Sequence, residues 1–92
     1  MKSIIVNDTS ICIVCGKPHP QEHHVFEGWA NRKISEKYHL TIPLCMEHHV
    51  RIHTDKKMMD AYRRLGQEVY EKEIGTREQF IKEFGKNFIL ED

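Results

Sequence analysis

The stretch LCMEHHVRIH, residues 44–53, decides the fold, because it joins the end of a predicted strand to a predicted helix rich in histidine. His49 and His53 are four positions apart and therefore lie on one face of a helix, one turn apart. Cys45 and His48 are three positions apart, a spacing that lets both side chains reach one tetrahedral ion. One short segment thus offers donors to two metal sites.

Two segments upstream of this stretch are predicted to pair as strands. Residues 22–28, EHHVFEG, form a strand that ends in a turn at Gly28, and residues 40–45, LTIPLC, form the returning strand. Pro43 confines the second strand to a sheet edge or a strand end. The connecting residues 29–39, WANRKISEKYH, are predicted to be a loop or a short helix.

The cysteines predict a structural zinc site. Gly16 and the prolines near it favour a knuckle turn around Cys12-x-x-Cys15, which lies about 30 residues before Cys45-x-x-His48. A redox-active or buried pair of thiols would not explain the second chelating pair, Cys45-x-x-His48. Disulfide bonds are also disfavoured, because three cysteines cannot all pair within one chain. The predicted zinc ligands are Cys12, Cys15, Cys45 and His48.

The remaining histidines predict a second site of a different kind. His23 and His24 are strand neighbours and point to opposite sides. If His23 faces the helix, it joins His49 and His53 as a third imidazole ligand and leaves coordination positions open, as catalytic metal sites require. His24 then stands beside the ion as a general base. A ligand set with His24 in place of His23 stays open, because strand register decides between them.

The flanking segments are predicted to support this core. Residues 1–10 form a strand or an ordered arm, and apolar residues recur at helical spacing from Met58 to Tyr70 and from Phe80 to Phe84. Thr76 and Gln79 have the spacing of a capping box. We expect a single α+β domain with an arm at 1–10, a zinc-stapled core at 11–55 and a helical tail at 56–92.

Charge is balanced overall but uneven along the chain. The 14 basic and 14 acidic residues cancel, yet residues 30–64 carry eight basic and four acidic side chains. This local excess favours a nucleic-acid partner, and we expect Arg51, Arg32 and Lys33 to contact phosphates. The sequence has no apolar run long enough to span a membrane and no signal-peptide pattern at its start, which predicts a cytoplasmic protein without a membrane partner.

The order EHH, LCxxHH and a further His at position 53 resembles the motif of the His-Asn-His (HNH) endonucleases, and the spacing is similar to that of the colicin nucleases. Residues 76–89 also resemble the tail of small phage and prophage HNH proteins, including the recombination-enhancement type. The resemblance implies a ββα-metal, treble-clef-like core followed by two helices. It further implies metal-dependent hydrolysis of DNA that leaves 5′ phosphates.

The resemblance also implies roles for individual residues. His23, His49 and His53 match the metal ligands, His24 matches the base, and Cys45-x-x-His48 matches a zinc knuckle with one cysteine replaced. The ion at the histidines would be Mg²⁺, Mn²⁺, Ni²⁺ or Zn²⁺. The chain departs from the family because no Asn lies shortly before Leu44; His39 is the favoured substitute and Asn31 the alternative.

Two hypotheses from other functional classes compete with the nuclease hypothesis. A non-catalytic zinc module that binds nucleic acid or a protein partner would tolerate the missing Asn and the neutral net charge. A metal-sensing or metal-storage protein would explain the seven histidines but not their placement on a strand and a helix. For the nuclease itself, a homodimer or a phage protein partner would suit double-strand cleavage.

Overall fold

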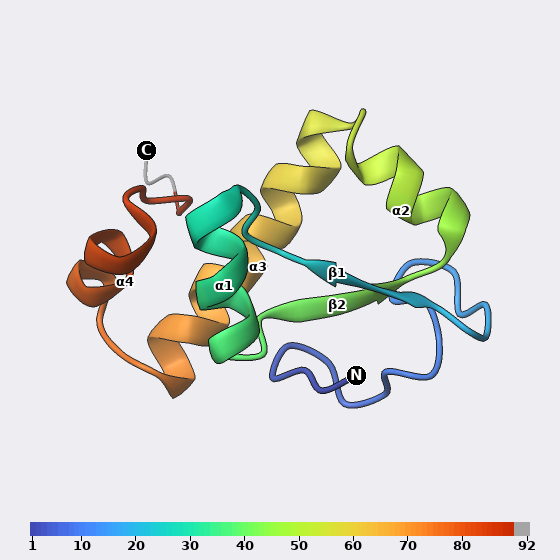
Figure 1. The fold of residues 1–92 in the computed structure, drawn as a ribbon, viewed down its shortest axis with the longest axis horizontal. Coiled ribbons are helices and arrows are strands. Elements are labelled where there is room, and N and C mark those ends of the chain that lie inside the picture. The colour runs from blue at the N-terminus through green and yellow to red at the C-terminus, as the bar shows by residue number, and fades with distance from the viewer. Residues whose placement is uncertain (90–92) are drawn as a thin grey trace.

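A two-stranded sheet lies at the centre of the molecule, with helices around it (Figure 1). The computed structural model describes residues 1–89, and within them the chain forms two strands and four helices. The elements are β1 (Gln21–His24), α1 (Trp29–Lys37), β2 (Thr41–Leu44), α2 (Met46–Ile52), α3 (Lys56–Glu73) and α4 (Arg77–Phe84). The α+β class predicted from the sequence is therefore confirmed.

The strands pair antiparallel, with His23 opposite Ile42 and His24 opposite Thr41. The residues between the strands, predicted as a loop or a short helix, form α1. Gly28 precedes this helix at φ 97°, a backbone conformation that glycine adopts without steric cost. The hydroxyl of Ser35 donates to the carbonyl of Phe26 at 3.0 Å and fixes α1 against the chain that leaves β1.

The two C-terminal helices predicted from apolar periodicity are present. Asp55 caps α3 by accepting from the backbone N–H of Met58 at 3.0 Å. The predicted capping box opens α4, because Thr76 and Gln79 each accept from the other's backbone N–H. These caps satisfy amide groups that the first helical turn leaves unpaired.

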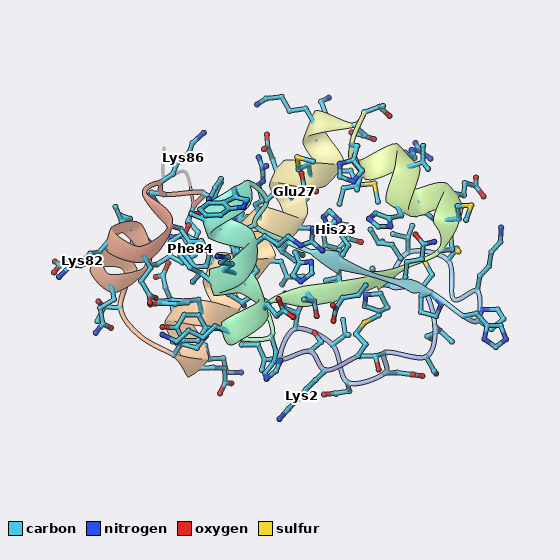
Figure 2. All side chains as sticks on the ribbon, viewed as in Figure 1. Lys2, His23, Glu27, Lys82, Phe84 and Lys86 are labelled. Carbon is cyan, nitrogen blue, oxygen red and sulfur yellow. The ribbon has the colours of Figure 1, made fainter. Side chains whose placement is uncertain are left out.

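The core combines aliphatic side chains of β2 and α2 with a group of aromatic rings from α3, α4 and the chain after β1. The Phe26 ring is 5.2 Å from that of Phe80 and 4.6 Å from that of Phe84, centroid to centroid. Figure 2 labels Phe84 at this packing surface. Burying each such ring contributes about 1.5–3 kcal/mol. The radius of gyration, 12.7 Å, is close to the roughly 12 Å of a compact chain of this length.

Residues 1–10 are an ordered arm, and the structure assigns them no strand. The Ser3 hydroxyl donates to the carbonyl of Thr41 at 2.6 Å, and the Thr41 hydroxyl donates to the carbonyl of Lys2 at 3.1 Å. The N–H of Ile4 donates to the carbonyl of His39 at 3.0 Å. Backbone and side-chain bonds thus hold the arm along β2.

Among the described helices, none is long and apolar enough to cross a membrane.

Candidate metal centres

The first centre is a cluster of three cysteines and one histidine that could hold a metal ion such as zinc. One donor atom from each side chain lies within 4.8 Å of the others; the four residues are Cys12, Cys15, Cys45 and His48. The first two come from the N-terminal segment, whereas Cys45 and His48 come from the junction of β2 with α2. The cluster therefore joins two parts of the chain that are far apart in sequence.

The distances within this cluster fit a tetrahedral zinc ion. A Zn–S bond of about 2.3 Å places two sulfurs on a tetrahedron about 3.8 Å apart. The Cys15 and Cys45 sulfurs are separated by 3.7 Å. The Nδ1 atom of His48 is 3.2 Å from the Cys45 sulfur and 3.8 Å from the Cys12 sulfur. Nδ1 is therefore the histidine atom suited to bind the ion.

The turn at Cys12 favours the thiolate form that metal binding requires. The N–H of Gly16 donates to the carbonyl of Cys12 at 2.9 Å, and that of Cys12 donates to the carbonyl of Lys17 at 2.8 Å, which closes the knuckle. Burial opposes ionisation of Cys12, but hydrogen bonds from backbone N–H groups of the knuckle and of Cys45 outweigh it and lower the pKa of the thiol.

The second centre consists of His23 on β1 and His49 and His53 at α2, with His53 forming the C-cap of that helix. One ring nitrogen from each lies within 4.8 Å of the other two. The His23 ring is 5.2 Å from the His49 ring and 5.6 Å from the His53 ring, centroid to centroid. His23 is 3% exposed and faces the helix, so the register brings His23 rather than His24 into this cluster.

Two side chains outside the cluster contact its Nδ1 atoms. The Nδ1 of His49 donates to the amide oxygen of Gln21 at 2.7 Å. The Glu27 carboxylate lies 3.4 Å from Nδ1 of His53 and 3.7 Å from Nδ1 of His23 (Figure 2). The Gln21 oxygen holds the proton of His49 on Nδ1 and leaves its Nε2 as the donor for an ion, the usual support of a metal-binding histidine, while the Glu27 carboxylate lies close to the other two rings.

The environment also favours neutral imidazoles, the form that binds metal ions. Burial, with the neighbouring rings of His49 and His53, lowers the pKa of His23 to about 4. Burial and the nearby His53 lower the pKa of His49, although Glu27 opposes this shift. The lowered pKa values of His23 and His49 favour the neutral rings that a metal ion needs.

His24 lies beside this centre but is not part of it. Its side chain is 13% exposed, and its Nε2 atom lies 3.7 Å from a carboxylate oxygen of Glu22. That atom is buried and has no hydrogen-bond partner among residues 1–89, which is uncommon for a buried polar atom. The hydrogen-bonding capacity of this nitrogen is therefore unused among the described residues, although the His24 ring lines the cavity described next.

One cavity of about 770 Å³ opens onto the histidines and continues along α1. Its walls include His23, His49 and His53 of the centre with His24 beside them, and Trp29, Arg32 and Lys33 from α1. Glu22, Glu27, Gly28 and Glu36 complete the lining. The histidine centre is therefore reachable from solvent.

Three residues expected at the site lie outside this cavity lining. His39 is at the turn before β2 with φ 57°, and Asn31 lies on α1; neither lines the cavity. Arg51 is exposed on α2 and lies 3.8 Å from the Asp55 carboxylate. Arg32 and Lys33 do line the cavity, whereas Arg51 does not.

Three residues at the site, Glu27, Gln21 and Trp29, were not predicted from the sequence. Glu27 and Gln21 contact the histidines only because the ends of β1 approach α2, and no spacing rule signals this contact. Trp29 could have been identified from the sequence, because it is the one tryptophan of the chain and lies three and four positions before Arg32 and Lys33. On a helix these positions share one face.

The fold and these clusters define a small α+β protein with a Cys/His group suited to hold a metal ion. The chain belongs to the family described as "Protein of unknown function (DUF968)", which it matches over residues 5–86. That range includes both candidate centres and all six helices and strands. No curated protein and no solved structure matches the chain.

Proposed function

We propose that this protein is a metal-dependent endonuclease of the His-Asn-His kind that hydrolyses DNA phosphodiester bonds and leaves 5′ phosphates. The strongest support is the convergence of His23, His49 and His53 in an open cavity with His24 beside them. Imidazole ligands on a strand and a helix suit an exchangeable divalent ion with open positions. The Cys/His cluster would hold a structural zinc.

The order of elements supports a ββα-metal core. The two strands are followed directly by α2, and the histidines come from the first strand and from this helix. The knuckle at Cys12 and the start of α2 together supply the sulfur-rich cluster, as in a treble clef. If the core is of the ββα-metal type, α1 is an insertion between its two strands, and α1 forms the wall of the cavity beside the histidines.

In the proposed reaction His24 accepts the proton of the attacking water. Its partner-free Nε2 atom and its place in the cavity wall suit this role. A divalent ion held by the three histidines would supply stabilisation of the negative charge that develops on the phosphate. Arg32 and Lys33 would hold the neighbouring phosphates of the strand.

The missing Asn of the motif requires another support for His24. Backbone pairing provides one, because His24 lies opposite Thr41 and the next N–H, of Val25, donates to the carbonyl of Leu40 at 3.1 Å. We infer that the strand ladder holds the base in this chain. The side chains of His39 and Asn31 are then dispensable for cleavage.

The test is cleavage of a supercoiled plasmid and of circular single-stranded DNA with Mn²⁺ or Mg²⁺. His24→Ala is expected to lose about 10²- to 10⁴-fold in rate, the usual contribution of a general base. The matched control is His19→Ala, since His19 is exposed in the loop after the knuckle. Circular dichroism and native mass spectrometry check that both variants fold and retain zinc.

Three outcomes distinguish the nuclease from the non-catalytic zinc module. Cleavage that is lost in His24→Ala and kept in His19→Ala supports the nuclease and its base. Cleavage that persists in His24→Ala excludes His24 from this role. A wild-type protein that binds DNA but cleaves neither substrate favours the non-catalytic zinc module.

A further inference from the structure

Trp29, the first residue of α1, is exposed to an unusual degree. Its exposed fraction is 84%, against 68% for Met46 and 63% for Val50, the next most exposed large apolar side chains among the described residues. Aromatic rings carry the largest apolar surface of any side chain and are normally buried or in contact with a partner. An indole held in solvent therefore marks a surface where binding would gain free energy.

The indole belongs to the same cavity as the histidine centre. Trp29 lines this cavity together with Arg32 and Lys33, which are three and four positions further along α1 and so share its face. The Lys33 ammonium lies 4.4 Å from the centre of the indole ring, within the range of a cation–π contact. A flat aromatic ring flanked by two cations thus faces the space beside the histidines.

The side chains that line the cavity indicate which class of ligand it can bind. Trp29 is the only large apolar side chain lining the cavity, so an apolar peptide or helix would find no further contacts there. Although Glu22, Glu27 and Glu36 also line the cavity, the indole has Arg32 and Lys33 beside it on α1 and so matches a nucleotide, whose base stacks on the ring while its phosphates meet the basic groups. A paired base inside a duplex has both faces covered by its neighbours, whereas an unpaired base has a face free to stack.

We propose that Trp29, with Arg32 and Lys33, is a nucleobase-stacking subsite that selects single-stranded DNA for the adjoining histidine centre. This inference deepens the proposed nuclease function and rests on it for the identity of the polymer. The subsite itself is a binding device, and its occupancy is measurable without cleavage.

The test uses the fluorescence of Trp29, which reports on this position alone because the chain has a single tryptophan. The zinc-loaded full chain is titrated, without added divalent ions, with a short oligothymidylate and with a duplex of equal length. We expect saturable quenching by the single strand and binding at least tenfold tighter than to the duplex. Absence of quenching while the single strand binds would overturn the subsite.

Variants with a labelled oligonucleotide then test the stacking contact. Loss of one stacked base corresponds to about 5- to 150-fold weaker binding, so Trp29→Ala should lose affinity for the single strand by this factor. Its affinity for the duplex should change little. Trp29→Phe should keep most of the affinity, because phenyl also stacks. Ile81→Ala, a truncation of an exposed apolar side chain on α4, is the matched control.

The results also separate this subsite from the nuclease proposal. A protein that cleaves DNA, but whose Trp29→Ala variant keeps the wild-type preference for single strands, overturns the subsite alone. A protein that cleaves nothing, but whose Trp29 fluorescence is quenched selectively by single strands, retains the subsite and loses the nuclease.

Discussion

Glu27 lies just after β1, and its carboxylate faces two of the three clustered histidines. It is 31% exposed, and the same oxygen is 3.4 Å from His53 and 3.7 Å from His23. A carboxylate at Nδ1 strengthens the other ring nitrogen as a metal donor and fixes the ring orientation. Glu27 is therefore proposed as a positioning residue for the ligands.

The substitution Glu27→Gln keeps the shape of this side chain and removes its charge. We expect about 10- to 100-fold weaker binding of Mn²⁺ or Co²⁺ to the zinc-loaded protein, the usual cost of losing such a partner. Isothermal titration calorimetry measures this change. Glu36→Gln, which removes the same charge from the α1 wall of the cavity, is the control. Equal weakening in both variants would indicate a general charge effect and contradict positioning by Glu27.

Spacing predicted both the paired histidines of one helix and the Cys/His cluster of two distant segments, but it does not predict strand register. The interval of four predicts that His49 and His53 lie together, and their rings are 5.5 Å apart. The choice between His23 and His24 required the strand register, which the sequence leaves open. His39 was favoured as the substitute for the missing Asn because its side chain can form hydrogen bonds. It lies outside the cavity lining, since the ability to form hydrogen bonds does not indicate where a residue lies in the fold.

At the scale of elements, Gly66 sets how closely α3 approaches the chain after β1. A Cβ atom at this position would lie 2.9 Å from a methyl group of Val25 and 3.1 Å from the ring of Phe26. Alanine favours a helix over glycine by about 1 kcal/mol, but overpacking a core costs about 1–3 kcal/mol. Gly66→Ala is therefore expected to lower the free energy of unfolding, by about 1 kcal/mol net.

Urea denaturation measures the effect of Gly66→Ala. The control is Lys57→Ala, at an exposed position of the same helix. A Gly66→Ala protein more stable than the wild type would show that α3 shifts without cost, and the close approach would then not limit the packing.

Glu83 on α4 joins this helix to α1 and α3. It accepts hydrogen bonds from the hydroxyl of Tyr38, at 2.6 Å, and from that of Tyr70. Burial opposes ionisation of Glu83, but these two hydrogen bonds outweigh it and lower its pKa below 4.5. The carboxylate therefore contributes stability above the pKa of the unfolded chain, and this contribution is lost as pH falls through the lower pKa of the folded state.

Glu83→Gln should consequently destabilise the protein most at neutral pH. We expect a loss of about 1–2 kcal/mol in the free energy of unfolding, since the amide still accepts but carries no charge. The difference between wild type and variant should stay constant down to about pH 5 and shrink as pH falls below about 4. Urea denaturation at several pH values tests this, and a difference that stays constant would exclude the ionised carboxylate as its cause.

The helices differ in how far their sequences predict them. α3 was predicted from its apolar periodicity and α4 from its apolar periodicity and its capping box, and both helices are present. α1 has no side-chain cap and no acidic residue in its first turn, which is why its segment was also compatible with a loop. β1 ends at His24, earlier than predicted, because Val25 and Phe26 leave the strand and enter the core.

At the scale of the whole molecule, the Cys/His cluster joins the N-terminal segment to the start of α2. A chain of 92 residues buries a limited apolar core, so a bound ion adds stability that packing alone supplies poorly. The histidine centre, by contrast, lies in the open cavity and consists of imidazoles only. The two centres should therefore differ in how firmly they hold an ion and in what its removal does.

A chelator titration should separate them. A mild chelator is expected to abolish cleavage before the far-ultraviolet circular dichroism changes, because thiolates bind zinc more tightly than three imidazoles bind an exchangeable ion. Native mass spectrometry should show one zinc retained after activity is lost. Cys12→Ser should release this zinc and unfold or aggregate the protein, whereas His19→Ala, in the exposed loop after the knuckle, should not. Loss of activity and of structure at the same chelator concentration would contradict this division between the two centres.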